Sequence, residues 1–431
     1  MKHNLLAIAF GISVSAAQAA ETILGVYILS RHVFEVASDE VVNSQIRVVT
    51  TDDTVLMNSA QAFLQGLYPA VGSLASETLR NGTVISGVSG GYQLIPIHIL
   101  DNGVNKEDTA WLQGTSKCTN AIKDSKNFEA SEEFKNTKTE TDSFYHSLES
   151  IWSGIFTPEE SSFENAYAIY DIINYALLHN ETIPSSDLLT EDAVFQLRTL
   201  ADKQQWGFAY NESVPVRAIA GSAFAGDVLI HFEDVIQSKG SKPKVGVQFN
   251  AYGTFISFFG LAQLPAADSN FYGLPDYGST MAFELFTYEA VESFPDVKDI
   301  NVRFLFHNGS TVDGGELIAY PLFGKMETEM PWTTFADEMK GFAVATTDHW
   351  CWVCGIDGGI CPVYNGTIEP LTHKTHHGLS GAVSGVVGAL VTLFVVLVIE
   401  GLVVAIAGLA IVKKKDVKRA ERGKGAESVS S

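Results

Sequence analysis

The sequence predicts an α/β protein that carries an inserted helical cap and one membrane helix. Short apolar, β-rich runs occur at residues 22–29 and 244–249, and a block with helical periodicity, residues 128–238, lies between them. Near the C-terminus, the 35 residues from Gly378 to Val412 contain one ionisable side chain, Glu400. That run is longer than the ~20 apolar residues that a helix needs to span a bilayer.

The composition excludes several classes of protein. The 431 residues are 46% hydrophobic and 18% charged, which is too apolar for a disordered chain. The formal net charge is −22, which does not suit a nucleic-acid partner. The last 19 residues carry seven basic and three acidic side chains, a net charge of +4. Removing this tail, Lys2 (+1) and Glu400 (−1) leaves −26, so the sequence describes an acidic body with a short basic tail.

Residues 1–19 are predicted to be a signal peptide. Lys2 and His3 form a positive start, an apolar run follows, and Ala17-Gln18-Ala19 provides a small-x-small cleavage site. Export makes the five Asn-x-Ser/Thr sequences candidate glycosylation sites. They are Asn81, Asn180, Asn211, Asn308 and Asn365. The exported domain is expected to cover residues 20–365.

In the helical block, apolar side chains recur three or four residues apart at 129–155, 163–179, 187–204 and 216–237. Pro184, followed by two serines, interrupts the block between the second and third helices. Strands outside a long helical insertion favour an α/β core with an α-helical cap at about residues 128–238.

Four cysteines lie in the exported part: Cys118, Cys351, Cys354 and Cys361. An even number in an oxidising compartment predicts two disulfides, and the sequence leaves the three possible connectivities open. Three of the cysteines lie within eleven residues, so at least one bridge joins this segment to itself. We interpret the Cys-x-x-Cys motif as part of a Cys- and Gly-rich loop and not as a redox pair.

The C-terminal segments predict a type I membrane topology. Counting back from Lys413 places the membrane helix at residues 388–412, after a stalk at residues 366–387, and the tail of residues 413–431 in the cytosol. The domain then faces the outside of the plasma membrane or the lumen of the secretory pathway. Glu400 lies near mid-membrane or, if the span is shifted toward the N-terminus, at the inner interface.

The membrane segment and the stalk bear on partners and metals. Gly381 and Gly385 form a GxxxG pattern that permits close helix packing, so a homodimer through the membrane helix is one candidate assembly. The three histidines of the stalk have no carboxylate or thiolate neighbours, so we predict no metal site and no cofactor.

Four segments in order along the chain carry a family resemblance. They are residues 22–32 (TILGVYILSRH), 58–69 (NSAQAFLQGLYP), 277–285 (YGSTMAFEL) and 302–309 (VRFLFHNG). Together they resemble the histidine acid phosphatases of the histidine phosphatase superfamily, most closely the fungal membrane-anchored members. The resemblance covers nearly all of residues 22–366. It implies a phosphoglycerate-mutase-like histidine phosphatase core.

The resemblance also implies a mechanism of phosphomonoester hydrolysis. A histidine after a core strand attacks the phosphoryl group, arginines bind its oxygens, and an aspartate protonates the leaving alcohol. On this basis His32 would be the nucleophile and Arg31 would bind phosphate.

Several positions depart from the family pattern Arg-His-Gly-x-Arg-x-Pro. Val33, Glu35 and Ala37 stand where the pattern has glycine, arginine and proline. A further family arginine is expected before residues 58–69, where this chain has Asp52 and Asp53 instead. Carboxylates at these positions would repel a phosphate.

The second half of the catalytic machinery is also altered. Asn250 and Ala251 follow the late core strand, where the family has a His-Asp pair. His307 and Asn308 look like that pair but come too late in chain order.

The interval between His32 and residues 58–69 is unusually short for the family. Either an early core helix has been lost, or coding sequence is missing from the gene model. Two functions therefore stay open. One is a cell-surface phosphatase that hydrolyses phosphomonoesters through phosphohistidine. The other, which the altered positions favour, is an inactive membrane glycoprotein that uses the fold to bind a small ligand or for structure.

Overall fold

The structure is a computed structural model that describes residues 22–27, 37, 40–87, 89–100, 117–179, 181–289, 293–310, 315–358 and 361. All of them belong to the first of two compact units, Met1–Lys374. The second unit, Thr375–Ser431, lies outside the described residues, as do the predicted signal peptide, stalk and membrane helix. No helix in the described ranges is both long and apolar enough to cross a bilayer. The membrane helix therefore stays a prediction.

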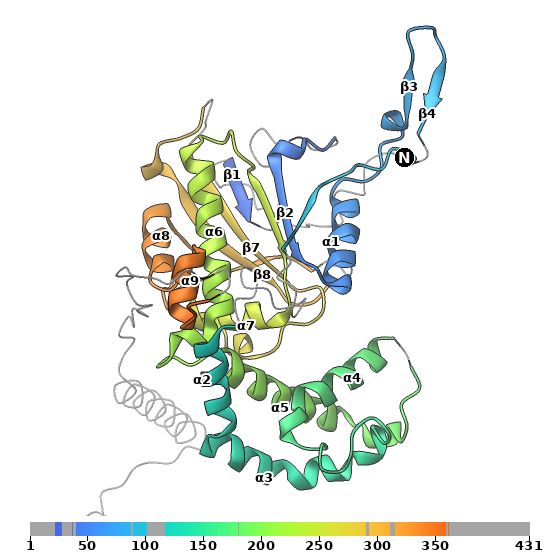
Figure 1. Ribbon diagram of the computed structural model, residues 1–431, viewed down its shortest axis with the longest axis vertical. Coiled ribbons are helices and arrows are strands. Elements are labelled where there is room, and N and C mark those ends of the chain that lie inside the picture. Colours follow the sequence, from blue (N-terminus) through green and yellow to red (C-terminus); the bar gives the residue numbers. More distant parts are fainter. Residues whose placement is uncertain are drawn as a thin grey trace, which may run out of the picture. The chain divides into compact units, whose positions relative to one another are not determined.

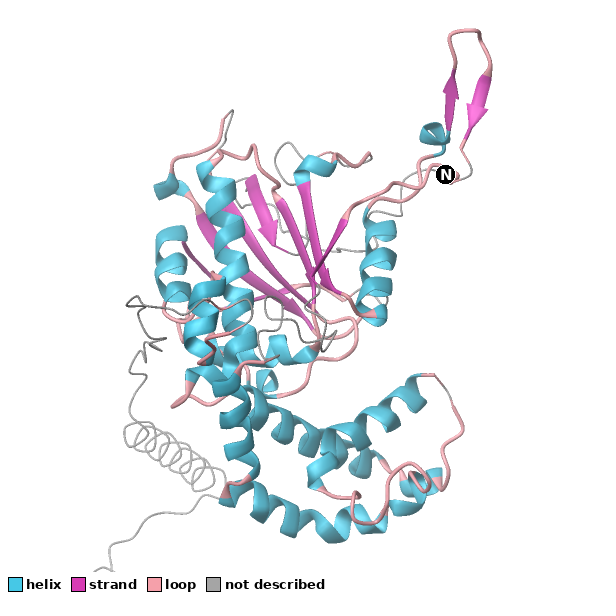
Figure 2. Ribbon diagram, in the orientation of Figure 1, coloured by secondary structure: helices cyan, strands magenta, loops and turns pink. Residues whose placement is uncertain are grey.

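Within the described residues, eight strands form one mixed sheet (Figures 1 and 2). The order is β10-β8-β7-β1-β6-β2-β5, with β9 beside β8. The neighbours among β1, β6, β2 and β5 run parallel, and the other pairs run antiparallel. The strands are Thr22–Tyr27 (β1), Ile46–Thr51 (β2), Ile97–Leu100 (β5), Val245–Phe249 (β6), Thr280–Thr287 (β7), Asn301–His307 (β8), Ile318–Tyr320 (β9) and Glu329–Pro331 (β10).

Strands β1 and β6 lie within the two apolar runs that the sequence indicated. Strand β2 was not predicted, although five of its six residues are β-branched. It pairs with β6 on one side and β5 on the other, and α1 (Thr54–Leu67) packs against β2 and β6. A separate hairpin, β3 (Ser76–Thr78) and β4 (Val84–Ser86), exposes all its side chains.

The main core lies between the sheet and the helices α6 (Ile219–Gln237), α7 (Tyr252–Leu261) and α8 (Trp332–Lys340). Phenylalanines dominate it, and several are fully buried. Among these are Phe224, Phe258, Phe283, Phe304 and Phe335. A Cβ at Gly221 of α6 would lie 2.5 Å from the backbone nitrogen of Phe258, so glycine is needed where α6 crosses α7.

The cap consists of α2 (Thr119–Glu129), α3 (Glu132–Ser147), α4 (Ala166–Leu178) and α5 (Glu191–Ala209), which pack around their own apolar cluster (Figure 1). The helix predicted at 129–155 is shorter in the structure: α3 begins after its N-cap, Ser131, whose hydroxyl accepts a backbone N–H, and ends at Ser147. The predicted cap limit at residue 238 is too late. Helix α6 is buried on most sides and packs on the sheet, so it belongs to the core.

Two disulfides join Cys118 to Cys354 and Cys351 to Cys361. The first links the start of cap helix α2 to α9 (Thr347–Cys354), and the second closes the C-terminal segment on itself. The expected loop around Cys351 and Cys354 is wrong, because both cysteines lie on α9. Each is bonded to a cysteine outside the Cys-x-x-Cys motif.

Candidate functional site

A cavity of about 650 Å³ lies where β2 and β6 end, beneath cap helices α4 and α5. We call it the site cavity. Strand β1 runs parallel to β6, so it points toward the same edge of the sheet, although its last residue, Tyr27, lies opposite Gly246 near the start of β6. Ligand sites in open α/β sheets gather at the carboxyl ends of parallel strands. The site cavity is therefore the candidate functional site.

Carboxylates outnumber basic groups in the described lining of the site cavity. Asp53, Asp171 and Asp276 face a single basic side chain, Arg198. The Asp53 carboxylate accepts the backbone N–H groups two and three residues further on, at 2.8 and 2.9 Å. It thus begins α1 as its N-cap, at the end of β2 where the family resemblance called for an arginine.

Arg198, on α5, is fully engaged by its neighbours. Its guanidinium donates to Asp202 at 3.0 Å, to Asp276 at 2.7 Å and to the Tyr170 hydroxyl at 2.9 Å. It also donates to the Leu274 carbonyl. Burial alone would lower the pKa of Arg198, but the two carboxylates outweigh it and hold the pKa above its usual value. The charge of Arg198 is therefore permanent and already neutralised.

The start of α7 forms another wall of the site cavity. Asn250 and Ala251 follow β6, and Asn250 accepts a hydrogen bond from the Gln248 amide at 3.1 Å. Ala251 is the N-cap and supplies no side-chain hydrogen bond to the helix. The positive end of the α7 dipole thus faces the site cavity without a capping side chain, which favours ligand atoms that are negatively charged or accept hydrogen bonds.

The predicted catalytic residues Arg31 and His32 lie outside the described residues, as do Val33 and Glu35. The structure describes the strand that leads to them, β1, as far as Tyr27. Their predicted roles are therefore neither supported nor contradicted by side-chain geometry.

Asn308 bonds to the loop that precedes β7, whereas His307 contacts the segment that follows β8. The Asn308 side chain accepts the Asp276 backbone N–H at 2.9 Å and donates to the Asp276 carboxylate at 3.0 Å. His307 Nδ1 lies 3.1 Å from the Glu316 carbonyl oxygen. Neither residue lines the site cavity, in agreement with their late position in the chain.

Three of the candidate glycosylation sites are described. Asn81 and Asn308 are exposed and Asn211 is half-buried. Asn180 and Asn365 lie outside the described residues. Glycosylation stays a prediction at all five positions.

Comparison with known families identifies the fold. Residues 6–307 match the sequence profile described as histidine phosphatase superfamily (branch 2). The chain belongs to this family. No curated protein matches the sequence of this histidine phosphatase family member.

Three solved phytase structures are similar to this branch 2 histidine phosphatase. That of Citrobacter braakii has a TM-score of 0.48 at 12% identity, with 71% of this chain and 81% of that chain covered. That of Klebsiella sp. ASR1 has a TM-score of 0.48 at 10% identity, covering 72% and 79%. That of Hafnia alvei, in its apo form, has a TM-score of 0.46 at 9% identity, covering 74% and 81%.

In this histidine phosphatase family member, the cap brings to the site polar residues that no sequence pattern indicated. Arg198 and Asp276 are 78 residues apart and meet only when the cap packs on the core. Tyr277, which donates a hydrogen bond to Asp171, was noted only as part of a family segment. No local pattern signals such pairs.

No group of three or more His, Cys, Asp or Glu side chains in the described ranges is arranged to hold a metal ion. The stalk histidines lie outside these ranges, and the absence of a metal and of a cofactor stays a prediction.

Proposed function

We propose that this member of the histidine phosphatase superfamily is a membrane-tethered glycoprotein whose site cavity binds a small polar ligand without hydrolysing phosphomonoesters. One observation carries the proposal. The single basic side chain in the described lining, Arg198, is already paired with Asp202 and Asp276. An incoming phosphate would have to compete with both carboxylates for it.

Charge favours this proposal over hydrolysis. Phosphoryl transfer is catalysed chiefly by positive groups that stabilise the charge on the phosphoryl oxygens. Like charges 4 Å apart repel by about 4 kcal/mol at the effective dielectric constant near a protein surface. The carboxylates of Asp53, Asp171 and Asp276 therefore oppose binding of a phosphate dianion.

Proton transfer gives a second argument. Release of an alcohol from phosphate requires a positioned acid. Ala251 has no proton to give, and Asn250 is a neutral amide that already accepts a hydrogen bond from Gln248. These residues can therefore contact a ligand, but they cannot protonate a leaving alcohol. The rings of Tyr167 and Tyr252, tilted by 41° with centroids 4.6 Å apart, favour a neutral ligand with an apolar surface.

The second candidate function is phosphomonoester hydrolysis through a phosphohistidine. It is supported by the family membership and by the sequence position of Arg31 and His32 shortly after β1, a strand that points toward the site edge. In this mechanism the His32 imidazole attacks phosphorus, the alkoxide leaves, and water then cleaves the phosphorus–nitrogen bond. Arg31 would bind the phosphoryl oxygens.

The proposed location rests on the two ends of the sequence. The signal-like residues 1–19, the apolar run before Lys413 and the basic tail support a type I topology. The family domain is then extracellular or lumenal.

The test is a phosphomonoesterase assay of the full-length protein in detergent, at pH 5 and pH 7. The wild type is compared with His32→Ala, and with Asn250→His/Ala251→Asp, which restores the family pair. We expect equal background rates for the wild type and His32→Ala. A wild-type rate that falls by a factor of about 10³ or more in His32→Ala would establish the second candidate function instead.

A further inference from the structure

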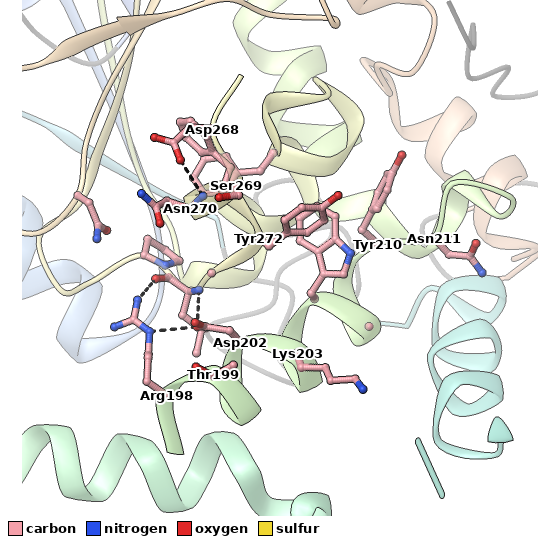
Figure 3. Close-up of a pocket in the computed structure, with 18 of the residues that line it drawn as sticks. Arg198, Thr199, Asp202, Lys203, Tyr210, Asn211, Asp268, Ser269, Asn270 and Tyr272 are labelled. Carbon is pink, nitrogen blue, oxygen red and sulfur yellow. Dashed lines mark hydrogen bonds and ion pairs between the residues drawn. The ribbon is translucent and has the colours of Figure 1, made fainter. Parts of the chain in front are cut away.

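A larger cavity, of about 1620 Å³, lies between cap helices α2 and α5 and the core segment around the 3-10 helix Ser269–Tyr272 (Figure 3). It shares Arg198, Leu274 and Pro275 with the site cavity and is otherwise lined by different residues. Its size exceeds the ~300–1,000 Å³ of pockets for drug-sized molecules, so it can hold an extended ligand.

Three aromatic side chains, Trp206, Tyr210 and Tyr272, form one side of this cavity, which we call the aromatic groove. The Trp206 ring centroid lies 4.7 Å from that of Tyr272 and 5.2 Å from that of Tyr210. Figure 3 shows Tyr272, Tyr210 and Asn211 following one another along this side. Tyr272 is 51% exposed. Apolar ring surface left in water is a source of binding free energy for any ligand that covers it.

The charges of the aromatic groove disfavour an anionic ligand. Every lysine and arginine among its described lining residues has a carboxylate partner within 4 Å. The pairs are Arg198–Asp202, Lys203–Glu133 and Arg217–Asp124. The lining also includes the carboxylates of Asp268 and Glu212. A phosphate or sulfate group would therefore meet negative charge without a matching cation.

Polar groups that can bind hydroxyls border the aromatic rings. The amide side chains of Asn127 and Asn270 are exposed, and no described residue bonds to them. Each amide offers both donors and an acceptor, and the Asp268 carboxylate offers further acceptor capacity. Such groups pair with neighbouring hydroxyls, whereas a lipid chain would leave them unpaired at a cost in free energy.

A pyranose sugar matches both kinds of surface. One face of the ring presents C–H groups that pack on an aromatic ring, and its edge presents hydroxyls that donate and accept hydrogen bonds. It carries no charge that would be repelled by the carboxylates or that would need a free cation.

We propose that the aromatic groove is a carbohydrate-binding site for a short chain of pyranose sugars. The sugar has two sources to distinguish, a free oligosaccharide and the glycan predicted at Asn211, which itself lines the groove. Asn308 also lines the groove, but its side-chain amide nitrogen is engaged with the Asp276 carboxylate at 3.0 Å. The Asn211 side-chain oxygen, Oδ1, accepts the Ser213 backbone N–H at 3.0 Å. Its amide nitrogen, the atom that carries an N-linked glycan, has no partner among the described residues.

The first experiment tests the carbohydrate chemistry on full-length protein in detergent. Ser213→Ala removes the glycosylation sequence without changing a groove residue, and this protein is titrated with chitotriose and mannotriose by calorimetry. We expect saturable binding that weakens about tenfold or more in Ser213→Ala/Tyr272→Ala, because one aromatic contact is lost. The matched control is Tyr175→Ala in the same background, since Tyr175 is 49% exposed and lines neither cavity. It should bind like the parent.

The second arm separates the two sources. The same titration is made with the wild type and with Ser213→Thr, which keeps the glycosylation sequence, and a mass shift relative to Ser213→Ala reports the Asn211 glycan. If the chain's own glycan occupies the groove, these proteins bind the free sugars at least tenfold more weakly than Ser213→Ala. Equal binding identifies a free oligosaccharide as the ligand.

The proposal is overturned if neither trisaccharide binds Ser213→Ala, or if Tyr272→Ala and Tyr175→Ala bind equally well. Trp206→Phe provides a second check at a position that packs against both apolar clusters. It keeps an aromatic ring and should retain most of the affinity for the trisaccharides. A loss of affinity as large as that of Tyr272→Ala would contradict binding through the ring faces of the aromatic groove.

Discussion

The cap is attached to the core in two regions that differ in kind. At the first, which we call the disulfide junction, Cys118 of α2 is bonded to Cys354 of α9, and the buried side chains of Arg217 and Asp124 meet at 2.6 Å. The Asn120 amide adds a hydrogen bond to the α9 backbone at 2.8 Å. Covalent linkage and burial make this junction hard to open.

At the second, which we call the polar junction, the contacts are partly exposed. Arg198 of α5 binds Asp276 of the core, whose side chain is 46% exposed, and Tyr277 of the core donates to Asp171 of α4. Exposed polar contacts are screened by water and salt. The site cavity lies at this junction. The cap thus has one covalent, buried attachment and one whose polar contacts are partly exposed, and the candidate site lies beside the second.

The largest effect is expected from removing the Cys118–Cys354 bond. Cys118→Ala/Cys354→Ala should lower the free energy of unfolding by about 5 kcal/mol, because the bond closes a loop with a sequence separation of 236. The control, Cys351→Ala/Cys361→Ala, removes a bond that closes a loop with a sequence separation of only 10. It should lower the free energy of unfolding by about 3 kcal/mol. Urea unfolding measures both. Equal losses would contradict a fixed attachment at this junction.

Arg217→Met should lower the free energy of unfolding by about 3 kcal/mol. The Arg217 and Asp124 side chains are 7% and 11% exposed, and the change leaves a buried carboxylate unpaired. Thermal unfolding is compared with that of Lys203→Met, whose 43% exposed side chain pairs only loosely with Glu133 and should contribute ~0.5 kcal/mol or less. A loss below about 1 kcal/mol for Arg217→Met would show that burial adds nothing at this junction.

Arg198→Met should lower the free energy of unfolding by less, about 1 kcal/mol, because solvent screens its partly exposed ion pairs. Its local effect should be larger. The Leu274 amide, bonded to Asp202 at 2.8 Å, should exchange its hydrogen faster when Arg198 no longer holds this segment. Hydrogen exchange followed by mass spectrometry tests this. Unchanged exchange near Leu274, or a stability loss equal to that of Arg217→Met, would contradict a weaker attachment of the cap at the polar junction.

The smallest effect concerns pH at the disulfide junction. Burial lowers the pKa of His349, on α9, below its usual 6.5. The folded protein therefore resists protonation, and the stability present above pH 6.5 falls as the pH drops and the unfolded chain takes up the proton. His349→Gln should show a weaker fall in melting temperature between pH 7.5 and pH 5.5. A parallel fall in both proteins would remove His349 as the cause.

Elements with a clear pattern of apolar side chains could be predicted from the sequence. Strands β1 and β6 and the cap helices have apolar patterns that local reading detects. The assignment of α6 to the cap failed because a helix buried on most sides has no clear amphipathic face. The helix α9 was missed because its cysteines suggested a loop.

Local sequence patterns could not predict which residues of the cap pair with which residues of the core. Arg198 meets Asp276, and Cys118 meets Cys354, over separations of 78 and 236 residues. The sequence did predict the altered positions Asp53, Asn250 and Ala251, because a family pattern supplied an expectation for each one. The structure adds the reason for one of them, since Asp53 is the N-cap of α1.

The most direct test of the proposed function is a calorimetric titration of the full-length protein in detergent with inorganic phosphate at pH 5. Wild type and His32→Ala are compared. Because the only basic side chain in the described lining is neutralised by carboxylates, neither protein should show saturable binding at millimolar phosphate. Saturable binding by the wild type that is lost in His32→Ala would contradict the proposal and assign the site cavity to phosphate chemistry.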